Sequence, residues 1–345
     1  MRTLSRRELN RALLARQLLL ARGSLPLPAA LEQVAGIQAQ YAPSMYIGLW
    51  SRLEGFERDA LTAALERRAV VQATLMRSTI HLVSRRDFWP FALATRAARR
   101  AHWLATARDA PGATAMAGAA RTLRRRLANG GTLRRTEIEQ LLGKTRAGGV
   151  GLWIDLVRVP PSGTWERRRA DLYGAAEDWI EPPRLTARAA TEHLVRSYLR
   201  GFGPASAKDA ASFTGLSATA LRTVLARLEL ERFRSEAGDE LLDLPGSPRP
   251  DPETPAPPRF LPTWDATLLV HARRTGLLPE EHRPKLFGIK TPQSFPSFLV
   301  DGAVAGTWRH ERGRIVLDPF GRLDPATRRA LDAEAERLAA LHGRA

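Results

Sequence analysis

The chain has 345 residues, no cysteine and a formal net charge of +17. The lack of cysteine excludes disulfides, iron–sulfur clusters and thiolate zinc sites. The length allows two or three modules or one large elongated domain. We find no apolar run of about 18 residues or more and no secretory signal at the first residues. We therefore expect a cytoplasmic protein without a transmembrane helix.

The excess of positive charge points to a polyanionic partner. Only four of the 53 basic residues are lysine, so 49 are arginine. A genome rich in G and C explains arginine in place of lysine, but it does not explain 53 basic against 36 acidic residues. Arginine neutralises phosphates and releases their counterions. A membrane surface is a weaker alternative, because no basic amphipathic anchor stands out.

The first part of the chain reads as helices followed by a short hairpin. Amphipathic patterns predict helices over residues 5–22, 28–34, 43–53 and 57–68. The first of these begins with a capping box made by Ser5 and Glu8. Two short strands follow, Val70–Met76 and Thr79–Ser84, joined by a turn at Arg77-Ser78. This order is typical of a winged helix.

A second unit of the same kind is predicted further along. Residues 119–142 hold two helical runs separated by Asn129-Gly130-Gly131. Thr136 and Glu139 are expected to form a capping box. A third helical run at 150–158 precedes strand-like pieces at Trp165–Arg169 and Asp171–Tyr173.

A third unit begins near residue 187. Residues 187–200 are helical, and Gly201-Phe202-Gly203-Pro204 breaks the pattern. Ala205–Thr214 and Ser217–Leu228 read as a helix-turn-helix with Gly215 in the turn. Residues 229–244 read as its wing, with a turn at Gly238-Asp239.

The remainder of the chain starts with a stretch rich in proline. Residues 245–258 contain seven prolines and predict an extended linker or a surface strap. Strands are then expected over 298–304, 305–310 and 313–317, with a hairpin turn at Asp301-Gly302. A terminal helix from Pro325 to Leu341 ends at His342-Gly343.

The three units predict an α+β fold that is mainly α, built from tandem winged-helix (helix-turn-helix) modules. We divide the chain into modules at 1–115, 116–185 and 186–245, followed by a linker and a C-terminal β-hairpin/helix region at 246–345. The internal sequence identity is too low to prove duplication.

Common catalytic motifs are absent from the sequence. We find no glycine-rich nucleotide loop, no HExxH and no GxSxG. The seven histidines are scattered, and no pair has a metal-binding spacing. The pair Glu280-Glu281 reads as solvated charge. We therefore expect neither a metal nor an organic cofactor.

One segment stands out at a predicted helix boundary, Gly36–Ser44. There Gln38 and Gln40 flank the small residue Ala39. Two glutamines at this spacing occur by chance in many proteins, and alone they are equally well explained as capping or surface amides.

A set of segments along nearly the whole chain gives this motif its weight. They are GIQAQYAP at 36–43, MRSTIHLV at 76–83, RGFGPA at 200–205, FLPTWD at 260–265 and LVDGAVAGTWR at 299–309. Together they resemble the AlkZ/YcaQ-like superfamily of winged-helix DNA glycosylases. The joint match is specific, although no single piece is. The resemblance implies tandem winged helices arranged as a C around duplex DNA.

The same resemblance identifies Gln38 and Gln40 as the catalytic pair. The AlkZ-like branch carries glutamine–aliphatic–glutamine, whereas the YcaQ-like branch has aspartate at the second position. Gln40 therefore places the chain nearer the AlkZ-like members, which protect antibiotic producers from their own DNA alkylators. Two residues depart from the pattern: Ala39 is smaller than the usual middle residue, and Ser78 stands where glycine is expected.

Two amides suffice only for an activated substrate. An N7- or N3-alkylated purine already carries positive charge, so the base leaves as a neutral species without a general acid. One glutamine carbonyl can stabilise the oxocarbenium-like sugar, and the other can hold the attacking water. We assign charge stabilisation to Gln38 and the water chiefly to Gln40, with shared or reversed roles left open.

Secondary candidates surround this pair in the sequence. Thr79 and His81 either line the site or contact DNA, or they complete a half-buried strand. Asp265 either touches the site or caps a helix that starts near Ala266. Three arginines are expected to contact phosphates, namely Arg77, Arg200 and Arg309. The runs Arg124–Arg126 and Arg167–Arg169 could equally be a solvated basic face.

The leading hypothesis is a monofunctional DNA glycosylase for cationic N7- or N3-alkylated purines in duplex DNA that acts as a monomer in self-resistance or repair. Whether it accepts bulky adducts or interstrand crosslinks is left open by the sequence. Lyase activity is not expected, because no lysine stands near the motif. The runner-up is a non-catalytic winged-helix transcription regulator, although no dimerisation zipper is visible. Housekeeping repair of small methyl adducts and a degenerate, damage-binding protein stay open.

Overall fold

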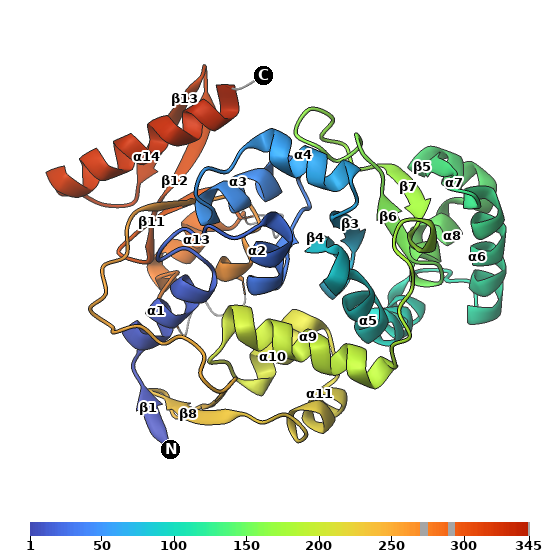
Figure 1. The fold of residues 1–345 in the computed structure, drawn as a ribbon, viewed down its shortest axis with the longest axis horizontal. Helices are drawn as coiled ribbons and strands as arrows, with labels where there is room; N and C mark the ends of the chain where they lie inside the picture. Colours follow the sequence, from blue (N-terminus) through green and yellow to red (C-terminus); the bar gives the residue numbers. More distant parts are fainter. Residues whose placement is uncertain (270–274, 289–293, 344–345) are drawn as a thin grey trace.

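The computed structural model describes residues 1–269, 275–288 and 294–343, and these form a mixed α/β fold dominated by helices (Figure 1). The α-helices are α1 Arg6–Arg16, α2 Leu27–Gln33, α3 Ala42–Arg52, α4 Arg58–Glu66, α5 Arg85–Thr106, α6 Ala113–Leu127, α7 Arg135–Leu142, α8 Lys144–Gly149, α9 Ala187–Phe202, α10 Ala207–Thr214, α11 Ala218–Leu225, α13 Arg283–Leu286 and α14 Pro325–Gly343. In Figure 1, α14 lies at one end, α6–α8 lie at the other, and α3, α4 and the first strands lie between.

A six-stranded sheet, in the order β2-β4-β3-β6-β7-β5, extends from β3 and β4 near the middle of the molecule to β7 and β5 beside α6–α8 (Figure 1). Its strands are β2 Ile37–Gln38, β3 Val70–Thr74, β4 Ile80–Ser84, β5 Thr132–Arg134, β6 Leu156–Arg158 and β7 Leu172–Ala175. The predicted hairpin is confirmed as the antiparallel pair β3–β4. Strand β3 also pairs with β6, with Gln72 opposite Arg158. The first two predicted units therefore share one sheet.

The long helix α5 occupies a stretch for which the sequence pattern predicted no element. Ser84 caps its start by accepting a hydrogen bond from the amide of Asp87. The apolar residues Phe88 and Phe91 are buried in the main core, where α5 packs along α9. Because α9 comes from the third predicted unit, this core is continuous across all three units.

The third unit has the predicted order of elements. Helices α10 and α11 are joined at Gly215, whose φ of +72° lies in the left-handed region that favours glycine. The hairpin that follows is β8 Glu231–Ser235 and β9 Glu240–Asp243. An unpredicted strand, β1 Arg2–Leu4, pairs in parallel with β8. The pattern missed β1 because its partner lies more than two hundred residues away.

The proline-rich segment is confirmed as a strap over α1. Arg7 donates to the carbonyl oxygen of Pro252 at 2.8 Å, and Arg11 donates to that of Thr254 at 2.7 Å. Beneath the strap, Arg16 and Asp243 form a fully buried, two-pronged ion pair at 2.7 and 2.8 Å. This pair ties α1 to the wing of the third unit.

The C-terminal region forms a sheet of its own, in the order β10-β11-β12-β13. The strands are β10 Arg259–Leu261, β11 Ser297–Val300, β12 Ala303–Glu311 and β13 Arg314–Pro319. The predicted turn is present, since Asp301 and Gly302 both have positive φ. Buried Phe298, Trp308 and Leu338 join this sheet and α14 to the core around α3.

Several local predictions are wrong. Helix α1 ends at Arg16 and not at residue 22, because Leu18 turns into the left-handed region at φ 56°. Glu137, and not Glu139, forms the cap of α7 by accepting from the amide of Arg134 at 2.6 Å. The run at 150–158 is a 3-10 turn at Val150–Leu152 followed by β6, since pairing with β3 outweighs the helical spacing.

The strand expected at Trp165–Arg169 is also wrong. These residues form a loop in which Trp165 packs edge-on against Tyr46 and lies under Arg58. The hydroxyl of Ser162 accepts from the amides of Asp171 and Leu172, which closes the loop before β7 begins. Side-chain hydrogen bonds of this kind compete with strand pairing. The division at 1–115, 116–185 and 186–245 and the C-shaped arrangement stay predictions.

Candidate active site

The glutamine motif begins on the edge strand β2, which ends at Gln38, and Gln40 lies just beyond that end. Gly36 leads into it with φ +79°, and a Cβ there would meet Val83 at 2.9 Å, so only glycine allows this close approach. Gln38 stands opposite His81 in the ladder between β2 and β4. The amide of Ala39 donates to the carbonyl oxygen of Ile80 at 2.7 Å. The sheet therefore holds the motif against the second strand of the first hairpin.

The two glutamines differ in exposure. Gln38 is buried, with 6% of its surface exposed, whereas Gln40 is exposed. The Oε1 atom of Gln38 accepts from Nη2 of Arg77 at 3.3 Å. The Oε1 atom of Gln40 accepts from the backbone amide of Ile80 at 3.1 Å. Both side-chain carbonyls are thus anchored, one by a cation and one by the backbone.

Arg77 lies in the tight turn between the two hairpin strands. Arg77 and Ser78 both have left-handed backbones, with φ 52° and 59°. The guanidinium donates to the carbonyl oxygen of Phe213 at 2.9 Å and stacks over that ring at 5.1 Å. Burial lowers the pKa of Arg77. Because its hydrogen bonds go to Phe213 and Gln38, Arg77 joins α10 to the motif; the phosphate contact expected of it stays a prediction.

Thr79 and His81 lie beside the motif, on the turn and on β4. The hydroxyl of Thr79 bonds the carbonyl oxygen of Met76 at 3.2 Å. His81 is 2% exposed, and its Nδ1 lies 3.1 Å from the carbonyl oxygen of Thr79. Burial, together with the charges of Arg77 and Arg99, lowers the pKa of His81 to about 3. His81 is therefore neutral near pH 7 and, since a carbonyl can only accept, carries its proton on Nδ1.

Asp265 lies in a buried ion pair with Arg52 of α3. Its carboxylate accepts from both terminal nitrogens of Arg52, at 2.9 and 3.0 Å. It also caps the 3-10 helix Ala266–Leu268 through the amide of Thr267 at 3.1 Å. Burial alone would raise the pKa of Asp265, but Arg52 and Thr267 hold it below its usual range. These contacts are those of a helix cap and a bridge to α3.

The other two arginines singled out in the sequence lie on α9 and on β12. Arg200, near the end of α9, donates to the backbone carbonyl of Glu32 at 3.2 Å. Arg309 lies on β12, half exposed, where it pairs with Glu311 and Asp318. Only Arg77 of the three contacts a glutamine of the motif.

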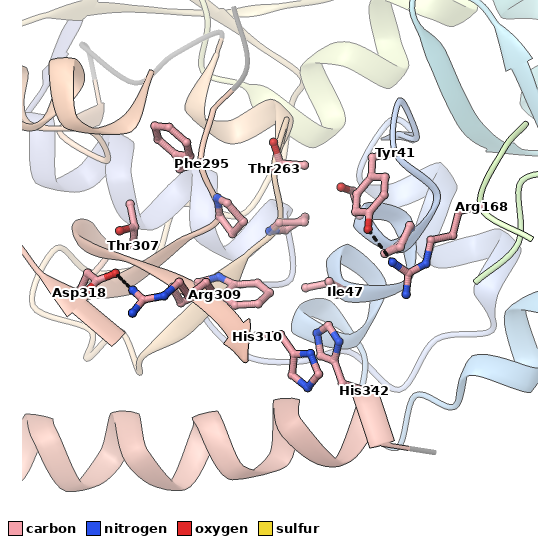
Figure 2. Close-up of a pocket in the computed structure, with 15 residues that line it drawn as sticks. Tyr41, Ile47, Arg168, Thr263, Phe295, Thr307, Arg309, His310, Asp318 and His342 are labelled. Carbon is pink, nitrogen blue, oxygen red and sulfur yellow. Dashed lines mark hydrogen bonds and ion pairs between the residues drawn. The ribbon is translucent and has the colours of Figure 1, made fainter. Parts of the chain in front are cut away.

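Next to the motif the structure shows a pocket of about 460 Å³ that the sequence did not predict (Figure 2). Tyr41, which directly follows Gln40, lines one side and accepts from Nη1 of Arg168 at 3.0 Å. On another side, the rings of His310 and His342 stack at 4.2 Å. Burial and the neighbouring His310 lower the pKa of His342 to about 4. The lining includes Arg309, which the sequence predicted as a DNA contact, and Arg168 of the run Arg167–Arg169, but the sequence did not show that they meet Tyr41 in one pocket.

Within the described ranges 1–269, 275–288 and 294–343, no group of three or more histidine, aspartate or glutamate side chains is placed to hold a metal ion. Over the same residues, none of the helices has both the length and the apolar character needed to cross a bilayer.

Comparisons with known proteins agree with this architecture. No curated protein sequence matches the chain. The DNA glycosylase AlkZ of Streptomyces sahachiroi has a similar fold, with a TM-score of 0.78 and 19% identity over 99% of this chain and 97% of that one. The family model described as "DNA glycosylase AlkZ-like" matches residues 31–341. The chain therefore belongs to the AlkZ-like family of DNA glycosylases.

Proposed function

We propose that this DNA glycosylase hydrolyses the N-glycosidic bond of cationic N7- or N3-alkylated purines in duplex DNA, with Gln38 and Gln40 as its catalytic residues. The observation that carries the proposal is the anchoring of both side-chain amides within the short segment Gln38–Gln40. Gln38 is held by Arg77, and Gln40 by the amide of Ile80. Fixed dipoles of this kind stabilise developing charge without reorganisation during the reaction.

The chemistry follows from what the site offers. Among the described residues, the hydrogen-bond partners of Gln38, Gln40 and His81 are a guanidinium and backbone groups, and none is a carboxylate. His81 is neutral and buried, so it does not protonate a leaving base near pH 7. The substrate must therefore carry its own activation, which an alkylated, positively charged purine does.

The contacts favour one division of roles between the two glutamines. The cation of Arg77 at 3.3 Å opposes positive charge near the carbonyl of Gln38. The Oε1 atom of Gln40 accepts from a neutral backbone amide instead of a cation, and the Gln40 side chain is exposed. We therefore assign stabilisation of the oxocarbenium-like sugar to Gln40 and the holding of water to Gln38, which reverses the assignment favoured by the sequence.

Base release from duplex DNA tests the proposal. Two substrates are compared, one with N7-methylguanine and one with a bulky N7-guanine adduct, for the wild type, Gln38→Ala and Gln40→Ala. We expect both variants to bind DNA as the wild type does and to lose base release by about a hundredfold or more. DNA binding without release of either base by the wild type would overturn the proposed substrate class.

The same assay addresses the biological role. Faster release of the bulky adduct, or unhooking of an N7–N7 interstrand crosslink, supports self-resistance to a DNA-alkylating natural product. Preference for the methyl adduct supports housekeeping repair. We further propose a monomer clasping its duplex, and light scattering of the enzyme with and without DNA checks this.

A further inference from the structure

A second cavity, of about 420 Å³, lies behind the turn of the first hairpin, between that hairpin, α5 and the segment α8–Leu152. Ser78 lies on its wall, next in sequence to the Arg77 that bonds Gln38. Arg99 of α5 and Arg158 of β6 also line it. We call this cavity the arginine pocket.

Neither arginine has a carboxylate as a hydrogen-bonded or ion-paired partner within the described residues. The Nε atoms of Arg99 and Arg158 are both buried and have no hydrogen-bond partner there. Arg158 is 7% exposed; its Nη2 donates to the hydroxyl of Thr74 at 3.1 Å, and its guanidinium lies 5.3 Å over the ring of Tyr173. Hydroxyl and ring contacts hold this guanidinium in place but do not neutralise it.

The one carboxylate among the described residues that line the pocket, that of Asp155, already pairs with another arginine. Asp155 accepts from Nη2 of Arg96 at 2.5 Å. Arg100, a neighbour on α5, donates to the carbonyl oxygen of Leu152 at 2.5 Å. A single carboxylate thus faces Arg96, Arg99 and Arg100 together, and the pocket keeps an excess of positive charge.

Burying a cation without a counter-ion is costly, and proteins normally pair such groups. Burial lowers the pKa of Arg99 to about 10, which still leaves it charged near pH 7. Two charged, partly unbonded guanidiniums on one concave wall are the arrangement that receives a phosphate, because each presents donors in a planar fork.

We propose that the arginine pocket binds one phosphate group, with Arg99 and Arg158 as its ligands, and that this phosphate belongs to the DNA strand that passes the glutamine motif. Ser78 lines the pocket and its neighbour Arg77 bonds Gln38, so one tight turn contacts both the pocket and the motif. The bound phosphate therefore fixes the register of the lesion against Gln38 and Gln40. The inference rests on the DNA substrate of the family and not on the roles proposed for the glutamines.

The test replaces single phosphates by neutral methylphosphonates, one position at a time, on both strands. The duplex carries a stable abasic-site analogue, which fixes the register and releases no base. Dissociation constants are compared for the wild type, Arg99→Gln and the control Arg329→Gln on the distant α14. We expect a methylphosphonate at one position near the analogue to weaken DNA binding by the wild type and by the control about tenfold or more. The same methylphosphonate should cause no further loss of DNA binding in Arg99→Gln.

The salt dependence of DNA binding is a second, independent measure of the same phosphate contact. The slope of log Kobs against log salt should become shallower by about 0.9 in Arg99→Gln, the value for one phosphate on duplex DNA. Arg158→Lys keeps the charge and should keep the slope, which guards against a variant that merely misfolds. Equal slopes in Arg99→Gln and Arg329→Gln, with no position that depends on Arg99, would overturn a DNA phosphate in this pocket.

A free nucleotide also carries a phosphate group that could occupy this pocket. Calorimetry with AMP and with inorganic phosphate distinguishes this ligand from a DNA phosphate. If AMP or phosphate binds the wild type but not Arg99→Gln, and no methylphosphonate has an effect, the pocket is a phosphate site but its ligand is a free nucleotide or phosphate and not DNA. No binding and no methylphosphonate effect would remove the site altogether. Gln38→Ala, which removes a proposed catalytic amide, should lose base release at saturating enzyme while keeping the wild-type salt slope, so failure of the catalytic proposal and failure of the phosphate site are told apart.

Discussion

His81 shows how burial sets the chemistry of a single residue. Its pKa of about 3 lies well below the usual 6.5 because the ring is buried near Arg77 and Arg99. The unfolded chain therefore takes up a proton as the pH falls below 6.5, while the folded chain does not until about pH 3. His81 thus contributes stability that is fully present above pH 6.5 and is lost on acidification.

We expect the wild type to lose free energy of unfolding between pH 6.5 and 4 faster than His81→Gln does, by about 1.4 kcal/mol per pH unit. Urea unfolding at half-unit steps measures the difference, with His102→Gln on α5 as the control. Base release by the wild type should show no inflection from His81 over the same range. Identical pH slopes for the wild type and His81→Gln would show that His81 does not titrate in this way.

Arg77 gives a prediction about catalysis at the same scale. Arg77→Met keeps an apolar side chain against the ring of Phe213 and removes the hydrogen bonds to Gln38 and to the carbonyl oxygen of Phe213. A hydrogen bond to a charged group is worth about 1.5–3 kcal/mol, so we expect kcat to fall about ten- to a hundredfold with KM little changed. Single-turnover base release measures both. A rise in KM at constant kcat would instead make Arg77 a phosphate ligand.

At the scale of elements, Asp265 bridges the 3-10 helix Ala266–Leu268 and α3. Asp265→Ala leaves Arg52 buried without its partner, and breaking such a pair costs about 3–5 kcal/mol. We expect a large drop in the urea midpoint, whereas kcat of the fraction that remains folded should stay near the wild-type value. Loss of kcat in a well-folded Asp265→Asn would place the carboxylate in the reaction instead.

Several elements defined by neighbours in the sequence were predictable, although the helix α5 and the cap of α7 were missed, and elements defined by distant partners were not predictable. The capping box of Ser5 and Glu8 is made within one turn of helix, and it is present as expected. Strand β1 and the pair of Asp265 with Arg52 depend on residues more than two hundred positions away. The glutamine motif was found by its resemblance, but its anchoring by Arg77 required the fold.

At the scale of the whole molecule, the shared sheet and continuous core make the units depend on one another. Strands β3 and β6 pair across the first predicted boundary, and α5 packs on α9 across the second. The buried pair of Arg16 and Asp243 ties the first helix to the third unit. Each unit is thus completed by its neighbours.

We therefore expect neither fragment 1–185 nor fragment 186–345 to unfold cooperatively alone. Each would expose apolar surface that the other buries, at about 25 cal/mol for each Å². Co-expression of the two should restore both a single unfolding transition and base release. A fragment that unfolds cooperatively at the midpoint of the full chain would show that its core is independent.

The left-handed backbone at Arg77 and Ser78 affects how the thermal stability of this enzyme could be raised. Serine at φ 59° stores strain of about 1 kcal/mol that glycine would relieve. Ser78→Gly is thus a substitution that a thermostability screen would reward. The same glycine would make the turn that positions Arg77 beside Gln38 more flexible. At this position, selection for thermal stability and selection for turnover therefore favour different residues.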